Sequence, residues 1–217
     1  MPSTDDANRA DAQAKAKYHH GDLREALISA VHRLVIDEGG DNVSLAVACR
    51  HAGVSTAAPY RHFRDRDEIL AEVAVRGYET LNVMAAEVIE RHGKYTLKTI
   101  TEMAKIYVSF AVEQQGMFRL MFGQHPALSQ NPLVRESANT CFGYVSNQIA
   151  GYCESRGIEG DPHDIALKLW TFVHGAASLL IDENFDTVSG AIDVDGMIDS
   201  VTPLLLEESV AGGPAKA

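Results

Sequence analysis

Residues 44–63 read SLAVACRHAGVSTAAPYRHF, and this stretch decides the fold that we predict. Apolar side chains recur three and four positions apart, as in a helix that packs on one side: Leu45, Ala48, Cys49 and Ala52. Ser44 offers an oxygen that can cap this helix, and Gly53 ends it because a residue without a Cβ atom tolerates left-handed backbone. Ser55 is placed to cap a second short helix, from Thr56 to about Phe63. The stretch therefore predicts a helix, a tight turn and a helix.

A helix-turn-helix can place its second helix in the major groove of DNA, where the first residues of that helix reach the base edges. The spacing alone leaves an ordinary helical hairpin of an all-α protein open as an alternative.

Further residues of the same region carry a family resemblance. They are Gly53-Val54-Ser55, Tyr60-Arg61-His62-Phe63, Arg64-Asp65-Arg66 and the run Asp67-Glu68-Ile69-Leu70. From about His20 to Thr80 the chain closely resembles the N-terminal DNA-binding domain of TetR-type transcriptional regulators. The resemblance implies an all-α fold, with a three-helix DNA-binding head that a long helix joins to a helical ligand-binding and dimerisation bundle.

The resemblance also implies which residues meet DNA. An aromatic residue and a histidine at the places of Tyr60 and His62 often touch phosphates, and Arg66 replaces a lysine that does likewise. Pro59 stands where many relatives have leucine, and it removes one backbone hydrogen bond, so we expect a recognition helix that starts loosely or one residue later. The expected DNA contacts are Ser44, Ser55, Thr56, Ala57, Pro59, Tyr60, Arg61, His62 and Arg66.

Charge is distributed unevenly along the chain, whose net charge is −11. Residues 17–66 carry seven basic and six acidic side chains, whereas the chain from Asp67 onward carries ten basic and twenty-one acidic ones. The positive charge therefore gathers where the docking helix is predicted, and the acidic remainder opposes non-specific binding to DNA.

Composition narrows the class of protein. The hydrophobic fraction of 46% is that of a soluble globular protein, and we expect no stretch long enough to span a membrane. Residues 1–17 have no apolar core, so they are predicted to be a disordered arm rather than a signal peptide, and residues 209–217 a disordered tail. A cytoplasmic location follows.

Catalytic and metal sites are not indicated. The chain has no nucleophile motif and no glycine-rich phosphate loop, so we predict no enzymatic activity and no cofactor. Cys49, Cys141 and Cys153 lack paired metal-ligand spacing, which favours reduced thiols over a metal site or a redox switch.

The rest of the chain is predicted to be helical. A long helix from Arg66 to about Arg91 crosses the boundary between a DNA-binding domain of residues 18–80 and a ligand-binding and dimerisation domain of residues 81–208. Further helices are expected over residues 97–111, 133–156, 162–180 and 194–207, and residues 117–122 form a short apolar segment between Gly116 and Gly123.

The helix that begins at Asp161-Pro162 is apolar on two sides, so it must be covered on two sides. With the last helix, which Pro203 should kink, it predicts a symmetric dimer held by two helices from each subunit. Trp170 and His174-Gly175 resemble the Trp-His-Gly signature of one C-terminal class of the family. One-turn spacing favours a structural pair of Trp170 and His174 over a ligand contact.

These observations predict a transcriptional regulator, a repressor that a small apolar ligand releases from a palindromic double-stranded operator. The alternative is a helical adaptor that binds only proteins. Candidate pocket residues are Tyr107, Phe110, Met117, Phe118, Met121, Phe122, Phe142, Tyr144, Trp170 and His174; the same side chains would also fill a dry core.

Overall fold

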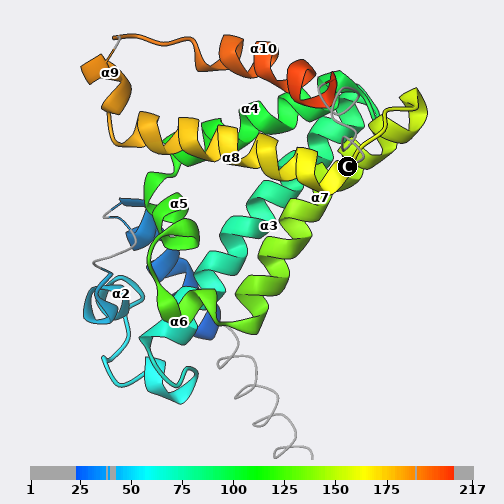
Figure 1. Ribbon diagram of the computed structural model, residues 1–217. Coiled ribbons are helices and arrows are strands. Elements are labelled where there is room, and N and C mark those ends of the chain that lie inside the picture. The colour runs from blue at the N-terminus through cyan, green and yellow to red at the C-terminus, as the bar shows by residue number, and fades with distance from the viewer. Residues whose placement is uncertain (1–22, 38, 40–42, 189, 208–217) are drawn as a thin grey trace, which may run out of the picture.

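The computed structural model describes residues 23–37, 39, 43–188 and 190–207 (Figure 1). Regular structure in this described part is entirely helical, as the sequence predicts. The first helix covers residues 23–37. The others are α2 (Leu45–His51), the 3-10 turn η2 (Pro59–Arg61), α3 (Arg66–His92), α4 (Leu97–Glu113), α5 (Gln115–Phe122), α6 (Pro126–Ser129), α7 (Pro132–Arg156), α8 (Pro162–Ile181), α9 (Asn184–Val188) and α10 (Val194–Glu207). The two predicted terminal segments, 1–17 and 209–217, lie outside the described residues.

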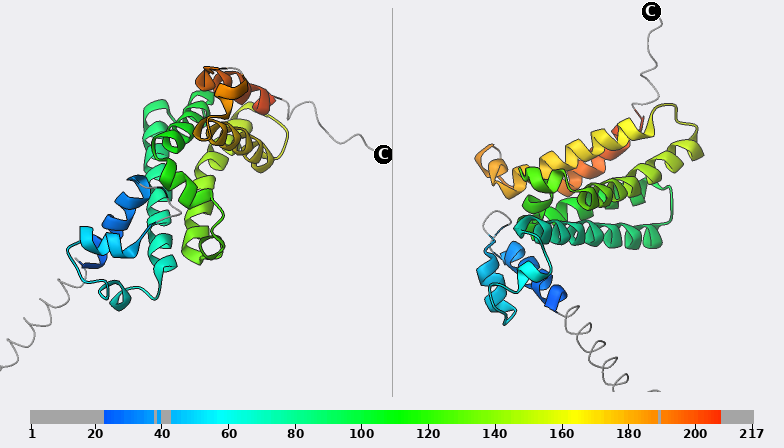
Figure 2. Two further views of the ribbon diagram at one scale, coloured as in Figure 1. Left: turned by 90° about the vertical axis from the view of Figure 1, so that its left-hand side faces the viewer. Right: turned by 90° about the horizontal axis from the view of Figure 1, so that it is seen from below.

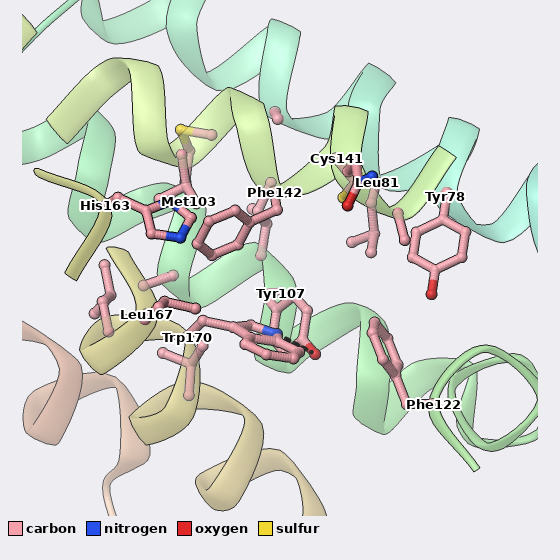
Figure 3. Close-up of a pocket in the computed structure, with 18 residues that line it drawn as sticks. Tyr78, Leu81, Met103, Tyr107, Phe122, Cys141, Phe142, His163, Leu167 and Trp170 are labelled. Atoms are coloured by element: carbon pink, nitrogen blue, oxygen red, sulfur yellow. Dashed lines mark hydrogen bonds between the residues drawn. The ribbon is translucent and has the colours of Figure 1, made fainter. Parts of the chain in front are cut away.

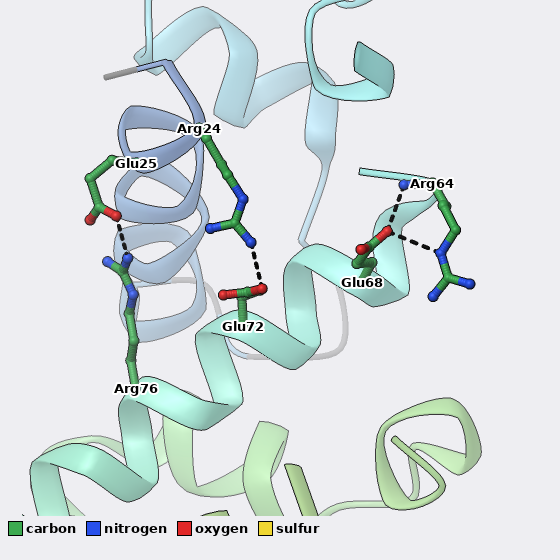
Figure 4. Close-up of polar contacts among 6 residues, drawn as sticks. All are labelled: Arg24, Glu25, Arg64, Glu68, Glu72 and Arg76. Carbon is green, nitrogen blue, oxygen red and sulfur yellow. Dashed lines mark hydrogen bonds and ion pairs between the residues drawn. The ribbon is translucent and has the colours of Figure 1, made fainter. Parts of the chain in front are cut away.

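The first helix, α2, η2 and the start of α3 form the head, at one end of the molecule in Figure 1. Its core contains Leu27, Val31, Ala48 and Ile69, each at most 1% exposed. Ion pairs between Arg24 and Glu72 and between Arg76 and Glu25 tie the first helix to α3 (Figure 4).

The predicted second helix of the motif is wrong in its length and type. Residues 56–58 form a turn, and only Pro59–Arg61 are helical, as one 3-10 turn. Pro59 has no N–H to donate to the carbonyl of Ser55, and that carbonyl accepts instead from the N–H of Ala58 at 3.0 Å. The proline therefore replaces an α-helical bond with a tighter i to i+3 turn.

The predicted serine caps are also absent. Ser44 is the N-cap of α2, but only its backbone carbonyl bonds, accepting from Ala48 N–H at 3.0 Å. No side chain caps η2, whose N-cap is Ala58 instead of Ser55. Gly53 does adopt the predicted left-handed conformation, with φ of 68°.

Helix α3 runs from the head into the rest of the molecule, hereafter the body (Figure 1). Asp65 caps it through a bond from Glu68 N–H, and Gly93 ends it with φ of 80°, so the predicted helix is confirmed. Continuous backbone thus connects the head to the body without a loop.

The body contains a bundle in which α4 packs against α3, α8 and α10, while α7 lies along α3 and under α8 (Figures 1 and 2). Its core cluster includes Ile100, Ile149, Ile165 and Ile198, which come from α4, α7, α8 and α10. Helices α7, α8 and α10 match the predicted ranges closely, whereas α6 and α9 were not predicted.

Helix α8 corrects the expectation about membrane-spanning stretches. Its 20 residues, Pro162–Ile181, have the length and mean hydropathy of a membrane span, although only 39% of that segment is buried. In this fold α8 packs on α4, α7 and α10, and its remaining apolar face is exposed. Its polar side chains include an ion pair between Asp164 and Lys168 at 2.8 Å.

Helix α5 joins the head to the body at close range. A Cβ atom on Gly116 would lie 1.8 Å from the carbonyl oxygen of Val35 in the first helix. A Cβ atom on Gly77 of α3 would lie 2.4 Å from the sulfur of Met121. Gly116 is therefore needed for α5 to approach the first helix this closely, because Val35 offers rigid backbone, whereas the methionine side chain at Gly77 could rotate away.

Candidate DNA interface and ligand cavity

The turn after α2 presents exposed side chains to solvent. Ser55, Thr56, Ala57 and Arg61 are exposed, and Tyr60 keeps 65% of its surface accessible. These five of the predicted DNA contacts are free to meet another molecule, because the short turn holds their backbone at the surface of the head.

The side chains of the other predicted DNA contacts are partly or fully buried within the head. Pro59 is buried, Ser44 is half-buried, and His62 is half-buried with its Nε2 atom inside the protein. Arg66 donates from Nε to the carbonyl of Val43 at 3.1 Å, which ties the start of α3 to the start of α2. In this structure these residues make contacts within the head, and their predicted contacts with DNA remain predictions.

Two exposed arginines were missing from the predicted contacts. Arg50 lies in the last turn of α2, and Arg64 precedes α3, where its Nε atom lies 3.3 Å from Glu68. Their positive charge was the available signal in the sequence. With Arg61 they give the segment from α2 to the start of α3 three exposed guanidinium groups.

The body holds an apolar cavity of about 430 Å³ between α3, α4, α5, α7 and α8 (Figure 3). It is lined by Tyr78, Leu81, Ala85, Met103, Ala104, Ile106, Tyr107, Phe122, Ala138, Asn139, Cys141, Phe142, Val145, His163, Leu167, Leu169, Trp170 and Val173. No lysine, arginine, aspartate or glutamate is among these residues. The size is within the range of small-molecule sites.

Four of the ten predicted pocket residues line this cavity: Tyr107, Phe122, Phe142 and Trp170. The other six do not. Phe110, Met117 and Met121 fill the core where α5 meets the head and α3, Phe118 is buried in the body core, and Tyr144 lines a separate surface groove on α7. His174 lies behind the cavity wall, against Tyr107.

Sequence reasoning missed the α3 wall of the cavity. Tyr78, Leu81 and Ala85 are buried residues of α3, and they line the cavity. Periodicity identifies a buried face but does not say whether the neighbouring atoms are side chains or empty space.

A chain of hydrogen bonds crosses one wall of the cavity. Trp170 Nε1 donates to the hydroxyl oxygen of Tyr107 at 3.2 Å, and the same hydroxyl lies 2.8 Å from Nδ1 of His174. Because an indole only donates, the arrangement that uses every group has the Tyr107 hydroxyl donating to His174 Nδ1. The predicted pairing of Trp170 and His174 is confirmed, with ring centroids 5.6 Å apart, and Tyr107 bridges their polar atoms.

Burial keeps the groups of this wall uncharged. It raises the pKa of Tyr78 to about 12 and the pKa of Cys141 to about 11, and it raises the pKa of Tyr107 further. Burial also lowers the pKa of His174, so its imidazole is neutral near pH 7. The cavity is therefore apolar and electrically neutral in its interior.

The cavity opens between α7 and α8. Asn139, His163, Leu167 and Trp170 are lining residues that are also exposed to solvent. The Phe142 ring lies between two of them, 5.4 Å from the His163 ring and 6.2 Å from Trp170. A small molecule would enter past these aromatic groups.

An all-helical head with an exposed turn after a short helix, joined to a helical body with a cavity, defines a helix-turn-helix DNA-binding protein. Comparison with known proteins supports this class. The family of bacterial regulatory proteins called tetR matches residues 27–73, and a tetracyclin repressor-like C-terminal domain matches residues 100–202. The chain belongs to the TetR family of DNA-binding transcriptional regulators.

Three individual proteins that are similar to this chain have sequence identities of 15 to 28%. The nucleoid occlusion factor SlmA of Vibrio vulnificus is 26% identical over 148 residues, which cover 67% of this chain and 74% of SlmA. A structure of a protein of unknown function from Rhodococcus sp. RHA1 superposes with a TM-score of 0.73 and 28% identity, covering 88% of this chain and 97% of that one. The complex of RolR with the ligand resorcinol has a TM-score of 0.64 at 15% identity, covering 92% and 98%, and so shares the fold.

Proposed function

We propose that this protein is a repressor that binds a palindromic operator as a homodimer and leaves it when a small apolar ligand enters the body cavity. The observation that carries the proposal is the position of α5. Phe122 at one end of this helix lines the cavity, and Gly116 near the other end is pressed against Val35 of the head. One short helix therefore touches both the ligand site and the DNA-binding part.

The head would bind DNA through the turn that follows α2. Tyr60 and the three exposed arginines, Arg50, Arg61 and Arg64, supply phosphate contacts that hold the head on the duplex. Thr56 and Ala57 are the exposed side chains at the start of the turn, and we assign them to the base edges. Because each head offers few cations, binding depends on two heads acting together.

Dimerisation would use the outer faces of α8 and α10. Leu179 of α8 is 41% exposed and Leu204 of α10 is 56% exposed, although both belong to the apolar helices of the body. A second copy related by a two-fold axis would cover both faces at once and form a four-helix contact. Two heads would then face successive turns of the operator, about 34 to 36 Å apart.

Ligand binding would act through the difference in affinity for two head arrangements. A molecule that displaces Phe122 moves α5, and the tight contact at Gly116 transfers that movement to the first helix. DNA is released to the extent that the ligand prefers the arrangement that fits the operator less well. That RolR, which shares the fold, is described with a bound ligand supports a ligand role for such a body.

Selection of bound fragments from genomic DNA tests operator binding directly. We expect one palindromic sequence to be enriched, and the Tyr60→Ala protein to bind all fragments more weakly by a similar factor. Thr56→Ala should instead change which sequence is preferred. If neither change affects DNA binding while a protein partner still associates, the protein-binding adaptor is the better description.

A further inference from the structure

Most hydrogen-bond donors inside the cavity already donate to other groups of the protein. The Trp170 N–H donates to Tyr107, the Tyr107 hydroxyl is bonded to His174, and the Tyr78 hydroxyl donates to the carbonyl of Met121 at 3.3 Å. A ligand that needs strong donors, such as a carboxylate or a ketone, finds these three already in use. The amide of Asn139 and the imidazole of His163 can donate, but both lie at the exposed mouth.

What remains inside is the capacity to accept. A phenolic oxygen that donates its proton still has lone pairs to receive a hydrogen bond. The oxygen of Tyr107 already accepts from Trp170, whereas that of Tyr78 accepts no hydrogen bond among the described residues. Tyr78 lies at the end of the cavity next to Phe122, with their ring centroids 5.8 Å apart (Figure 3).

The walls exclude charge and favour rings. No ionised side chain lines the cavity to compensate a buried ligand charge, whose transfer from water costs several kcal/mol or more when it is unpaired. Phe122, Phe142 and Trp170 offer faces and edges of aromatic rings to whatever occupies the space, and such contacts add to the gain from apolar burial.

We propose that the cavity takes an uncharged molecule with an aromatic ring and one hydroxyl group, and that this hydroxyl donates a hydrogen bond to the phenolic oxygen of Tyr78. The inference rests on the proposed ligand role of the cavity and specifies the ligand class. It also gives Tyr78 a selecting role, because a ligand that offers only an acceptor would place one oxygen against another.

Calorimetric titration of the full chain with three probes of one shape tests the proposal. The probes are para-ethylphenol, which donates, para-ethylanisole, which only accepts, and para-ethylbenzoate, which is an anion. We expect the phenol to bind at least about tenfold more tightly than the anisole, because the ether has no proton to donate to the Tyr78 oxygen and would leave the two oxygens facing each other without a hydrogen bond. Binding of the benzoate should be undetectable.

Two further measurements test whether the probe binds in this cavity and contacts Tyr78. Trp170 is the only tryptophan of the chain and lines the cavity, so its emission should change on saturation with the phenol. The Tyr78→Phe protein keeps the ring and loses the oxygen. It should bind the anisole at least as tightly as the unchanged protein does, because the opposing oxygen is gone, while the preference for the phenol falls to about threefold or less. Tyr144→Phe, at the surface groove on α7, is the matched control and should leave the preference intact.

Several results would overturn the proposal: equal binding of phenol and anisole, strong binding of the benzoate, a preference that survives in Tyr78→Phe, or no binding of any probe. Failure of the repressor proposal looks different. If the phenol binds with the expected Tyr78 dependence but operator affinity stays the same, the ligand class stands and ligand-driven release is wrong.

Discussion

Replacement of Gly116 by alanine tests the contact between α5 and the head. The new Cβ atom would lie 1.8 Å from the carbonyl oxygen of Val35, and also 3.1 Å from the Cα atom of Gly39. Since Cβ atoms essentially never approach other atoms within 3.0 Å, α5 and the first helix must separate by at least about 1 Å. Both neighbours are backbone, so no side-chain rotation relieves the overlap.

The expected cost is that of overpacking, about 1 to 3 kcal/mol in the free energy of unfolding. For a chain of this size that loss lowers the melting temperature by roughly 2 to 12 °C. The intrinsic preference of alanine for helices opposes the loss by up to about 1 kcal/mol, which makes the lower half of the range more realistic. Operator affinity should fall as well, because the first helix supports the turn that carries Tyr60.

Thermal unfolding and operator binding are measured on Gly116→Ala and on Gly143→Ala in parallel. Gly143 lies inside α7, and a Cβ atom there meets nothing within 4 Å, so this control should be equal to or more stable than the unchanged protein. The reasoning is refuted if both variants gain stability to the same degree and bind the operator equally well, since α5 would then not press on the head.

Three further outcomes are expected. The free energy of unfolding should fall as the pH drops from about 7.5 to 5.5. Burial lowers the pKa of His32 and His174 in the folded protein, so the unfolded chain takes up protons first. Urea unfolding at several pH values should show that the stability of His174→Gln depends less on pH. Arg24→Ala, which loses the ion pair to Glu72 and a guanidinium 5.0 Å from the Phe63 ring, should cost about 1 kcal/mol in chemical denaturation. In a salt titration, log operator affinity against log salt should have a slope no steeper than about −5.4, because Arg50, Arg61 and Arg64 of the two heads would neutralise six phosphates.

The sequence predicted the helices well wherever local signals agreed with packing. The end of α3 was predicted from Gly93, and the structure shows that Asp65 caps its start; both roles need no knowledge of the rest of the fold. The same reasoning failed at the recognition segment, where the serine and alanine pattern favoured a helix. Pro59 removes a bond in the middle of so short a segment, and the loss is too large for the few remaining bonds to offset.

The site was predicted less completely than the fold. Four of the cavity residues were identified because aromatic side chains on an apolar helix are conspicuous, but Met117 and Phe118 gave the same signal and are packed in the core. Which of two such residues faces a cavity depends on how α5 is turned against α3. That orientation is set by the close approach at Gly77 and Gly116, a contact between segments far apart in the chain.

The length of α3 determines how far a small tilt of this helix displaces its far end. Its 27 residues extend about 40 Å, so a tilt of about 5° at the body end displaces the opposite end by about 3.5 Å. That distance matches the rise of one base pair, about 3.4 Å. In the proposed mechanism, a small tilt of α3 would therefore be enough to move the turn after α2 of each head by about one base-pair step relative to the duplex.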